Sequence, residues 1–205
     1  MMNTIVFATG NKDKLREIGE IIPDCRLVSM AEAGFTGDIE EGADSFRENA
    51  LIKARAVRSF IGAERPEYAD AIVLADDSGL VIDALGGMPG VMSHRWLGER
   101  TYPQAMADVL EEMKDVPDEE RAARFVCAIG ACLPDGREFT VQETVEGIVG
   151  HEIIGENGFG YDPFFYLPER GLTTAQLSPD EKNAISHRGK AIRSMKALLE
   201  KEGLL

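Results

Sequence analysis

The chain has 205 residues, of which 44% are hydrophobic and 28% are charged. This length allows a buried core, and we expect one domain over residues 1–205, with two lobes that the sequence does not separate. Acidic residues outnumber basic ones by 36 to 22, which gives a formal net charge of -14. A negative field of this size repels nucleic acids and anionic membranes, so we expect neither as a partner. A small polyanion can still bind where a divalent metal and a local group of Lys and Arg offset that charge.

Two features of the sequence bear on location. No apolar run approaches the roughly 18 residues that span a bilayer, and the first residues lack the pattern of a signal peptide. The three cysteines, an odd number, show no metal-ligand spacing, and Cys127 and Cys132 fall within one apolar run. We therefore expect reduced cysteines and a cytoplasmic protein.

The first elements are a short apolar strand at residues 5–8, a polar turn at residues 9–14, and a helix marked by Leu15, Ile18 and Ile22 at helical spacing. Two lysines stand at the helix start, where positive charge opposes the helix dipole. A phosphate held by the backbone N–H groups and these lysines would remove that conflict. The pattern is not a P-loop, and a solvated helix start is the alternative interpretation.

A second helix is predicted after Ser45, which forms a capping-box pattern with Glu48 and precedes an apolar stripe over residues 50–61. Lys53 lies off that stripe, one turn after Asn49. Its side chain can point to solvent, as most lysines do, or into a cleft.

The central stretch is an apolar run at residues 72–75 that leads directly into Asp76, Asp77, Ser78 and Gly79. Such a run predicts a buried strand, and the carboxylates would then lie where the strand leaves the sheet, the usual place for ligands in open α/β sheets. Because side chains alternate along a strand, one aspartate can face a cleft while the other anchors the loop. A carboxylate held there suits Mg2+. The alternative is a simple turn, since all these residues are common in turns.

The following segments predict a mixed sheet. A possible continuation of the central strand at residues 81–82 precedes a glycine-rich loop, and Thr101 with Gln104 forms another capping-box pattern. Residues 125–133 are apolar on both faces, which indicates an interior strand, and residues 137–146 alternate as a half-exposed antiparallel partner does.

Two polar segments lie in the last third of the chain. The loop at residues 155–163 presents Phe159 and Tyr161 beside Asp162, a set that can stack on a planar base, although an ordinary turn with a buried aromatic is equally consistent. A helix is predicted from residue 179 after the N-cap Ser178. Beyond it, His187 and Arg188 form either a solvated basic turn or a fork that grips an anion or a carbonyl.

Taken together, these segments resemble the inosine triphosphate pyrophosphatase family, the dITP/XTP diphosphatases, from about residue 3 to about residue 200. The matching motifs are Thr9-Gly-Asn-x-x-Lys14, Glu40-Glu41, Asn49-Ala50 with Lys53, Ala75-Asp-Asp-Ser-Gly79, Leu85-Gly-Gly-x-Pro-Gly90, Gly158-Phe-Gly-Tyr-Asp-Pro163, and Glu181-Lys182 with Ser186-His-Arg188. Each motif alone is weak, but this many in order and at these spacings are specific.

The resemblance implies hydrolysis of a non-standard purine nucleoside triphosphate (ITP, dITP or XTP) to the monophosphate and pyrophosphate. It also implies an elongated α/β fold of two lobes around a long mixed β-sheet with flanking helices, and a substrate cleft between the lobes. A Mg2+ requirement and a homodimer belong to the same expectation.

The resemblance further assigns roles to individual residues. The phosphates would be held by residues of the first turn together with two lysines: Thr9, Gly10, Asn11, Lys12, Asp13, Lys14, Lys53 and Lys182. Asp77 would be the catalytic base and a metal ligand, and Ser78 a substrate contact. The family often has Glu-Glu-Thr-Gly where this chain has Glu40-Glu-Gly-Ala43, which leaves open which glutamate reaches the metal. We assign Glu41.

The purine would be recognised by the later motifs. Phe159 would stack on the base, and the resemblance completes its pocket with Gly160, Tyr161 and Asp162. His187 and Arg188 would donate to the 6-keto oxygen. Adenine carries an amino group there, so these donors would face another donor, at a cost of about 1–3 kcal/mol for each unsatisfied group. Guanine also has the 6-keto oxygen, and the sequence does not show how it is rejected.

The chemistry of the reaction agrees with these residue types. Hydrolysis of a triphosphate requires charge neutralisation, which Mg2+ supplies, and a carboxylate that accepts a proton from water. Two alternatives remain, of which the first keeps the fold but changes the substrate and the second drops catalysis. One is a pyrophosphatase for pyrimidine or modified nucleotides, as in the related septum-inhibitor proteins. The other is a nucleotide sensor without catalysis, which would not require both aspartates and Glu41. The preference among ITP, dITP and XTP, the number of metal ions and the dimer surface are left open.

Overall fold

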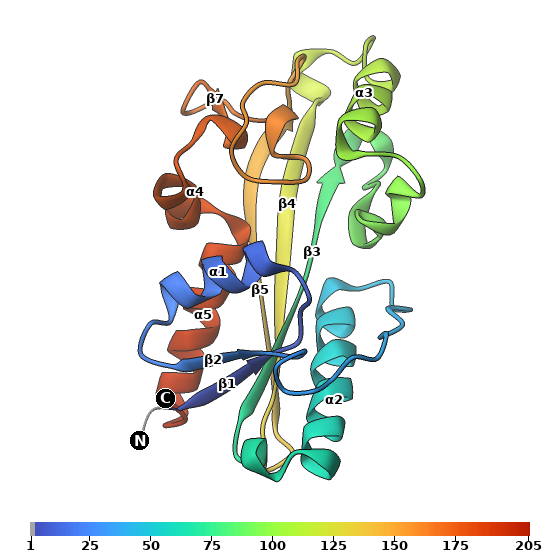
Figure 1. Cartoon of the computed structure of the whole chain (residues 1–205). Helices are drawn as coiled ribbons and strands as arrows, with labels where there is room; N and C mark the ends of the chain where they lie inside the picture. Colours follow the sequence, from blue (N-terminus) through green and yellow to red (C-terminus); the bar gives the residue numbers. More distant parts are fainter. Residues whose placement is uncertain (1–2) are drawn as a thin grey trace. The chain divides into compact units, whose positions relative to one another are not determined.

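The computed structural model describes residues 3–205, with Asp13 described in its backbone only. Five α-helices and seven strands are present in this part of the chain (Figure 1). In chain order they are β1 (Thr4–Phe7), α1 (Lys12–Ile21), β2 (Arg26–Ser29), α2 (Phe46–Glu64), β3 (Ile72–Ile82), α3 (Tyr102–Glu112), β4 (Ala122–Cys132), β5 (Glu138–Val149), β6 (Phe165–Leu167), β7 (Leu172–Thr173), α4 (Pro179–Ile185) and α5 (His187–Lys201).

The strands form one sheet in the order β2-β1-β3-β4-β5-β6-β7. Strand β1 is parallel to both β2 and β3, whereas β6 is antiparallel to both β5 and β7. The sheet is therefore mixed. Together with the five α-helices of the described chain, it confirms the predicted α/β class. None of the helices in residues 3–205 is long and apolar enough to cross a membrane.

Two compact units make up the described chain. Unit 1 contains the described residues up to Asp77, together with Cys127–Glu143 and Arg188–Leu205, and unit 2 contains Ser78–Val126 and Thr144–His187. Strands β3, β4 and β5 each contribute residues to both units. Neither unit is contiguous in sequence, which explains why composition shows no boundary. One functional domain over residues 1–205 stays a prediction.

Unit 1 has apolar side chains on both faces of its strands. Ile5 and Phe7 of β1 pack in a cluster that includes residues of α1 and α5, while Val6 and Ala8 pack in a second cluster with residues of α2. Because successive side chains point to opposite faces, a strand covered on both sides must be apolar throughout. This is why residues 5–8 and 72–75 appear as unbroken hydrophobic runs.

Helix α2 lies directly against the backbone of β4 at Gly130. A Cβ atom at that position would lie 2.9 Å from the backbone nitrogen of Leu51 and 3.0 Å from the carbonyl carbon of Ala50. Both are backbone atoms and cannot rotate away. The missing side chain of Gly130 therefore sets how closely the first turns of α2 approach the sheet.

The predicted helix starts are largely confirmed. Thr101 and Ser178 form complete capping boxes with Gln104 and Glu181. The side chain of Ser45 caps α2 by accepting from the backbone N–H of Glu48, but the Glu48 carboxylate bonds Arg55 at 2.7 Å instead of completing a box. A charged guanidinium is a stronger partner for a carboxylate than a backbone amide.

The central strand differs from the sequence prediction. Strand β3 continues through Asp76, Asp77 and Gly79 to Ile82, so the carboxylates lie within the strand and not at its end, and the turn interpretation is wrong. Neighbouring β1 ends earlier, since its last paired residue, Phe7, is opposite Leu74. The aspartates therefore lie just beyond the carboxyl end of β1, where loops and helices take the place of the neighbouring strand.

Unit 2 has its own hydrophobic core. The buried residues of α3 and the strand segments of unit 2, including Met106, Val109, Phe125 and Phe165, form one cluster. Arg121 is buried beside it and donates to backbone carbonyls of Val149, Met113 and Gly150 at 2.7–2.8 Å. All three cysteines are free thiols, and Cys127 and Cys132 are buried in the core, as predicted for these two.

Candidate functional site

Asp76 and Asp77 point to opposite faces of β3. Asp76 falls on the face of Ile72 and Leu74, which pack in the cluster with residues of α1 and α5, and Asp77 falls on the face of Val73 and Ala75, which pack with residues of α2. Both side chains are buried, at 1% and 6% exposure. A buried carboxylate requires partners, and the two find them on different helices.

The partners of Asp76 are cations. The Nζ atom of Lys14, on α1, lies 2.8 Å from Asp76 Oδ2, and Nε of Arg188, at the start of α5, lies 3.5 Å from the same oxygen. Nη1 of Arg188 also donates to Oε2 of Glu17 at 2.7 Å. Burial alone would raise the pKa of Asp76, but the Lys14 and Arg188 charges overcome it and hold the pKa far below its usual range. The pKa of Arg188 is raised, because Asp76 and Glu17 outweigh its own desolvation.

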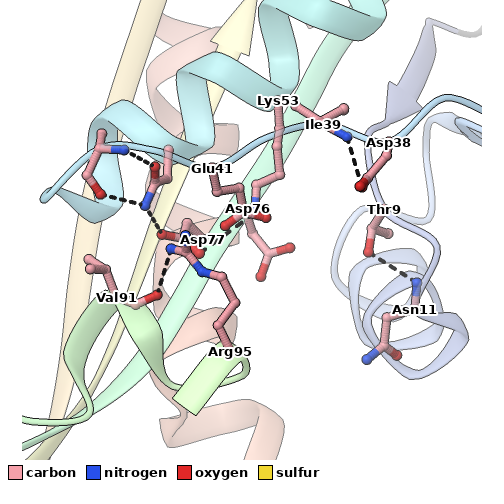
Figure 2. A network of polar contacts seen from close by, with 12 residues as sticks. Thr9, Asn11, Asp38, Ile39, Glu41, Lys53, Asp76, Asp77, Val91 and Arg95 are labelled. Atoms are coloured by element: carbon pink, nitrogen blue, oxygen red, sulfur yellow. Dashed lines mark hydrogen bonds and ion pairs between the residues drawn. The ribbon is translucent and has the colours of Figure 1, made fainter. Parts of the chain in front are cut away.

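The partners of Asp77 lie on α2, and the loop before this helix brings Glu41 to one of them, Lys53 (Figure 2). Nζ of Lys53 is 3.6 Å from Asp77 Oδ1 and 3.0 Å from Glu41 Oε1, and Nδ2 of Asn49 donates to Asp77 Oδ2 at 3.2 Å. Burial raises the pKa of Asp77 to about 6, and the negative charges of Glu41 and Asp76 add to that shift, while Lys53 and Asn49 oppose it. Asp77 is therefore a carboxyl group that can exchange a proton near neutral pH.

Glu41 and Asp77 form the candidate metal site. No group of three or more His, Cys, Asp or Glu suitable for a metal occurs among the described residues. The two carboxylates share one ammonium group, that of Lys53, so a positive charge is favoured beside both of them. Mg2+ typically takes one or two carboxylates and completes its shell with water and substrate phosphates, so this pair of hard oxygen donors fits Mg2+. Glu41 belongs to this group, whereas Glu40 is exposed.

The predicted phosphate turn is held by its own polar side chains. Thr9 Oγ1 accepts from the backbone N–H of Asn11 at 3.1 Å, and Asn11 Oδ1 accepts from the N–H of Lys14 at 3.3 Å. Gly10, Asn11 and Lys12 are exposed, and α1 begins at Lys12, so the turn presents the positive end of a helix to solvent. The side chain of Asp13 lies outside the described residues.

In unit 2 the residues of the predicted base pocket gather around Asp162. Oδ2 of Asp162 accepts from Lys182 Nζ at 2.6 Å and from the backbone N–H of Phe159 at 2.8 Å, and Oδ1 accepts from Thr174 Oγ1 at 2.8 Å. The Lys182 ammonium lies over the Phe159 ring, 4.8 Å from its centroid. A Cβ atom on Gly158, which has φ of +74°, would lie 2.2 Å from Asp162 Oδ2, so only glycine fits this loop.

The other residues of the predicted base pocket are placed differently. Tyr161 is a core residue: its hydroxyl donates to the carbonyl of Ser93 at 3.0 Å, and its ring meets Tyr102 edge-on at 5.1 Å between centroids. Gly160 and Ser78, both in unit 2, are partly exposed.

His187 and Arg188 are neighbours in sequence but belong to different units. The His187 ring stacks on Phe125 with centroids 5.0 Å apart, while Arg188 contacts Asp76 and Glu17. Both are buried, at 7% and 3% exposure, so the solvated basic turn is wrong.

Comparison with known proteins identifies the family. Residues 5–198 match the Ham1 family. The chain belongs to the Ham1 family. It is 43% identical over 203 residues to the dITP/XTP pyrophosphatase of Bacillus subtilis (strain 168), covering 98% of each chain. Among solved structures, a HAM1 protein from Coxiella burnetii has a TM-score of 0.84 and 38% identity over 98% of this chain and 100% of that one. The nucleoside-triphosphatase / dITP/XTP pyrophosphatase from Mycobacterium abscessus has a TM-score of 0.75 and 38% identity, covering 94% and 98%.

This result confirms the resemblance found in the sequence, since relatives of this Ham1 family protein carry the predicted family's name. The structure also adds polar residues that the sequence did not single out for a role. Glu17 lies three positions after Lys14, one turn further along α1, and this spacing is the only sequence feature that pointed to a place beside Lys14. Thr174 shows no signal in the sequence. Asn49 was part of a matching motif with Ala50 and Lys53, but the sequence gave it no role.

Proposed function

We propose that this Ham1 family protein hydrolyses the bond between the α- and β-phosphates of non-standard purine nucleoside triphosphates, namely ITP, dITP and XTP, releasing the monophosphate and pyrophosphate. The observation that carries the proposal is the Asp77 group: a buried carboxyl with a pKa raised to about 6, beside Lys53 and Glu41. The names of relatives at 43% identity support the same reaction.

We propose that Asp77 and Glu41 hold Mg2+. When bound, Mg2+ neutralises phosphate charge and lowers the pKa of a coordinated water. In this scheme Asp77 is the carboxylate that accepts the proton of the attacking water. Lys53 then balances the remaining negative charge of the two carboxylates.

The triphosphate is assigned to the first turn and the helix that follows it. The exposed N-terminus of α1 offers backbone N–H groups to an anion, and Lys14 offers a positive charge. Lys53 and Lys182 add further positive charge. The residues proposed for this contact are Thr9, Gly10, Asn11, Lys12, Asp13 and Lys14, with Ser78 as a further substrate contact.

The purine base is assigned to the Asp162 group. The Phe159 side chain is partly exposed, and the purine base is proposed to stack on its aromatic ring. The Lys182 ammonium lies over the same ring, 4.8 Å from its centroid. Gly160, Tyr161 and Asp162 shape that loop. The roles of His187 and Arg188 as donors to the 6-keto oxygen are proposals of the same kind. A homodimer and a cytoplasmic location also stay predictions.

A pyrophosphate-release assay tests the function directly. We expect turnover of ITP, dITP and XTP with Mg2+, far less turnover of GTP and ATP, and none in EDTA. Faster turnover of dUTP than of ITP would instead favour the pyrimidine or modified-nucleotide reading. Tight ITP binding without pyrophosphate release would favour a sensor. Asp77→Asn serves as the inactive reference, and full activity of that variant would reject the assignment of Asp77.

A further inference from the structure

Asn49 is buried with 0% exposure, and its side-chain amide contacts two separate parts of unit 1. Nδ2 donates to Asp77 Oδ2 at 3.2 Å and to the carbonyl of Ala43 at 3.1 Å. Oδ1 accepts from the backbone N–H of Ala43 at 3.0 Å. One side chain therefore holds both the central carboxylate and the loop that carries Glu41, which it contacts two residues after Glu41.

These contacts define the orientation of the amide. The nitrogen faces two oxygen acceptors, those of Asp77 and Ala43, and the oxygen faces a backbone N–H. The reverse orientation would place an oxygen against two oxygens and an NH2 group against an N–H, which removes all three bonds. Asn49 is thus a donor toward Asp77, and its position cannot be filled by an acceptor of the same shape.

Asn49 and Lys53 act on the same carboxylate from one helix face. They are four residues apart on α2, so their side chains are stacked one turn from each other. Asn49 bonds Oδ2 of Asp77, and Lys53 approaches Oδ1 at 3.6 Å. The two contacts engage both oxygens of the carboxylate and therefore restrict its rotation.

The same helix controls the loop of Glu41. Lys53 bonds Glu41 at 3.0 Å, and Asn49 binds both backbone groups of Ala43. Residues 39–43 have no helix or strand structure, and a Cβ atom added at Gly42 would have no neighbour within 4 Å, so the loop depends on such side-chain contacts for its position. Loss of Asn49 would release the loop on one side and Asp77 on the other.

We infer that Asn49 is a positioning residue, which holds Asp77 and the Glu41 loop at the spacing that the hydrolysis requires. The inference rests on the proposed function. It assigns to Asn49 no contact with substrate. A misplacement of about 1 Å in a reacting group can cost about 100-fold in rate, so a residue of this kind acts on kcat.

Three variants test the inference through kcat and KM for ITP. Asn49→Ala removes all three bonds, and Asn49→Asp keeps the shape but replaces the donor with an acceptor. Ser45→Ala, a matched control, removes the N-cap of the same helix without touching Asp77. We expect kcat to fall about 10- to 100-fold in both Asn49 variants, with KM changed less than about 3-fold, and kcat to be retained in Ser45→Ala. Retained kcat in Asn49→Asp, or an equal loss in Ser45→Ala, would overturn the inference.

A measurement without nucleotide separates this inference from the proposed function. NMR spectra of the metal-free protein contain the side-chain NH2 signals of Asn49, which are assigned because they are lost in Asn49→Asp. The same signals are then compared between wild-type protein and Asp77→Ala. A shift of these signals supports the contact, and unchanged signals refute it. If wild-type protein releases no pyrophosphate from ITP, the proposed function fails, whatever the NMR result. If wild-type protein is active and Asn49→Ala keeps its kcat, only the inference fails.

Discussion

The carboxylates of Asp76 and Asp77 are adjacent on β3 and have opposite electrostatic surroundings. Two cations face Asp76, with Lys14 at 2.8 Å and Arg188 at 3.5 Å. Asp77 instead shares one ammonium, that of Lys53, with Glu41. The pKa of Asp76 is therefore lowered, while burial raises that of Asp77 to about 6. Removing the two charges is expected to change the free energy of unfolding in opposite directions.

Asp77→Asn should stabilise the metal-free protein at pH 8. The folded-state pKa of Asp77 is raised from 3.8 to about 6, so the folded protein binds a proton that the unfolded chain releases, and stability falls as pH rises through this window. Asparagine does not ionise, so the variant should gain about 2–3 kcal/mol above pH 6 and little at pH 4. Urea unfolding in EDTA at both pH values measures this. An equal effect at both would contradict the raised pKa.

Asp76→Asn should destabilise the protein at neutral pH. Its folded-state pKa is lowered, so the carboxylate contributes stability above the unfolded pKa of 3.8, and this contribution is lost as pH falls. The variant leaves Arg188 and Lys14 with less compensating charge, at a cost of about 3–5 kcal/mol. Urea unfolding at pH 7 should show a lower midpoint than wild type. An unchanged midpoint would mean that the ion pairs make no net contribution.

Gly130→Ala should disturb the approach of α2 to the sheet. The added Cβ would lie 2.9 Å from the Leu51 nitrogen, so the helix must move, and we expect a loss of about 1–3 kcal/mol. Gly62→Ala, near the other end of α2, is the matched control, because its Cβ would meet only the flexible end of Arg58 at 3.5 Å. That variant should gain up to about 1 kcal/mol from helix propensity. Thermal unfolding of both variants distinguishes the packing loss expected in Gly130→Ala from the gain in helix propensity expected in Gly62→Ala.

Gly158→Ala should weaken binding of the purine nucleotide. The new Cβ would clash with Asp162 Oδ2 and lie 2.9 Å from Lys182 Nζ, so the pair beside Phe159 must separate. We expect the KM for ITP to rise about 10-fold, which corresponds to about 1.4 kcal/mol. Gly171→Ala is the control, since Gly171 has a similar φ of +67° but only Tyr166 at 3.8 Å nearby. Both should lose stability through backbone strain, and a KM increase in both would refute the role of the Asp162 pair.

The predictions from sequence succeeded where the cause is local. The N-cap Ser178 was predicted from residues within one helical turn, and its side chain accepts from the backbone N–H of Glu181 as expected. The apolar runs of β1 and β4 were visible because each strand is buried on both faces. The class of fold and the family followed from such segments and their order.

Local composition was misleading at the central strand. The residues Asp76, Asp77 and Ser78 are turn formers, and only cations from elsewhere in the chain make a buried strand possible there. One of these, Arg188, is separated from Asp76 by 112 residues and from Glu17 by 171. Sequence spacing carries no signal for contacts at such separations.

The order of short motifs was therefore enough, by itself, to identify the family, the mixed sheet and the residue types needed for phosphate and metal chemistry. Tertiary structure decided which of these residues meet. It placed the side chains of Asp76 and Asp77 on opposite faces of β3, and it brought Glu41 rather than Glu40 to Lys53. It also brought Asn49 into contact with Asp77. The physical reason is that a charge buried in the sheet is stable only beside a partner in space, and folding alone determines those neighbours.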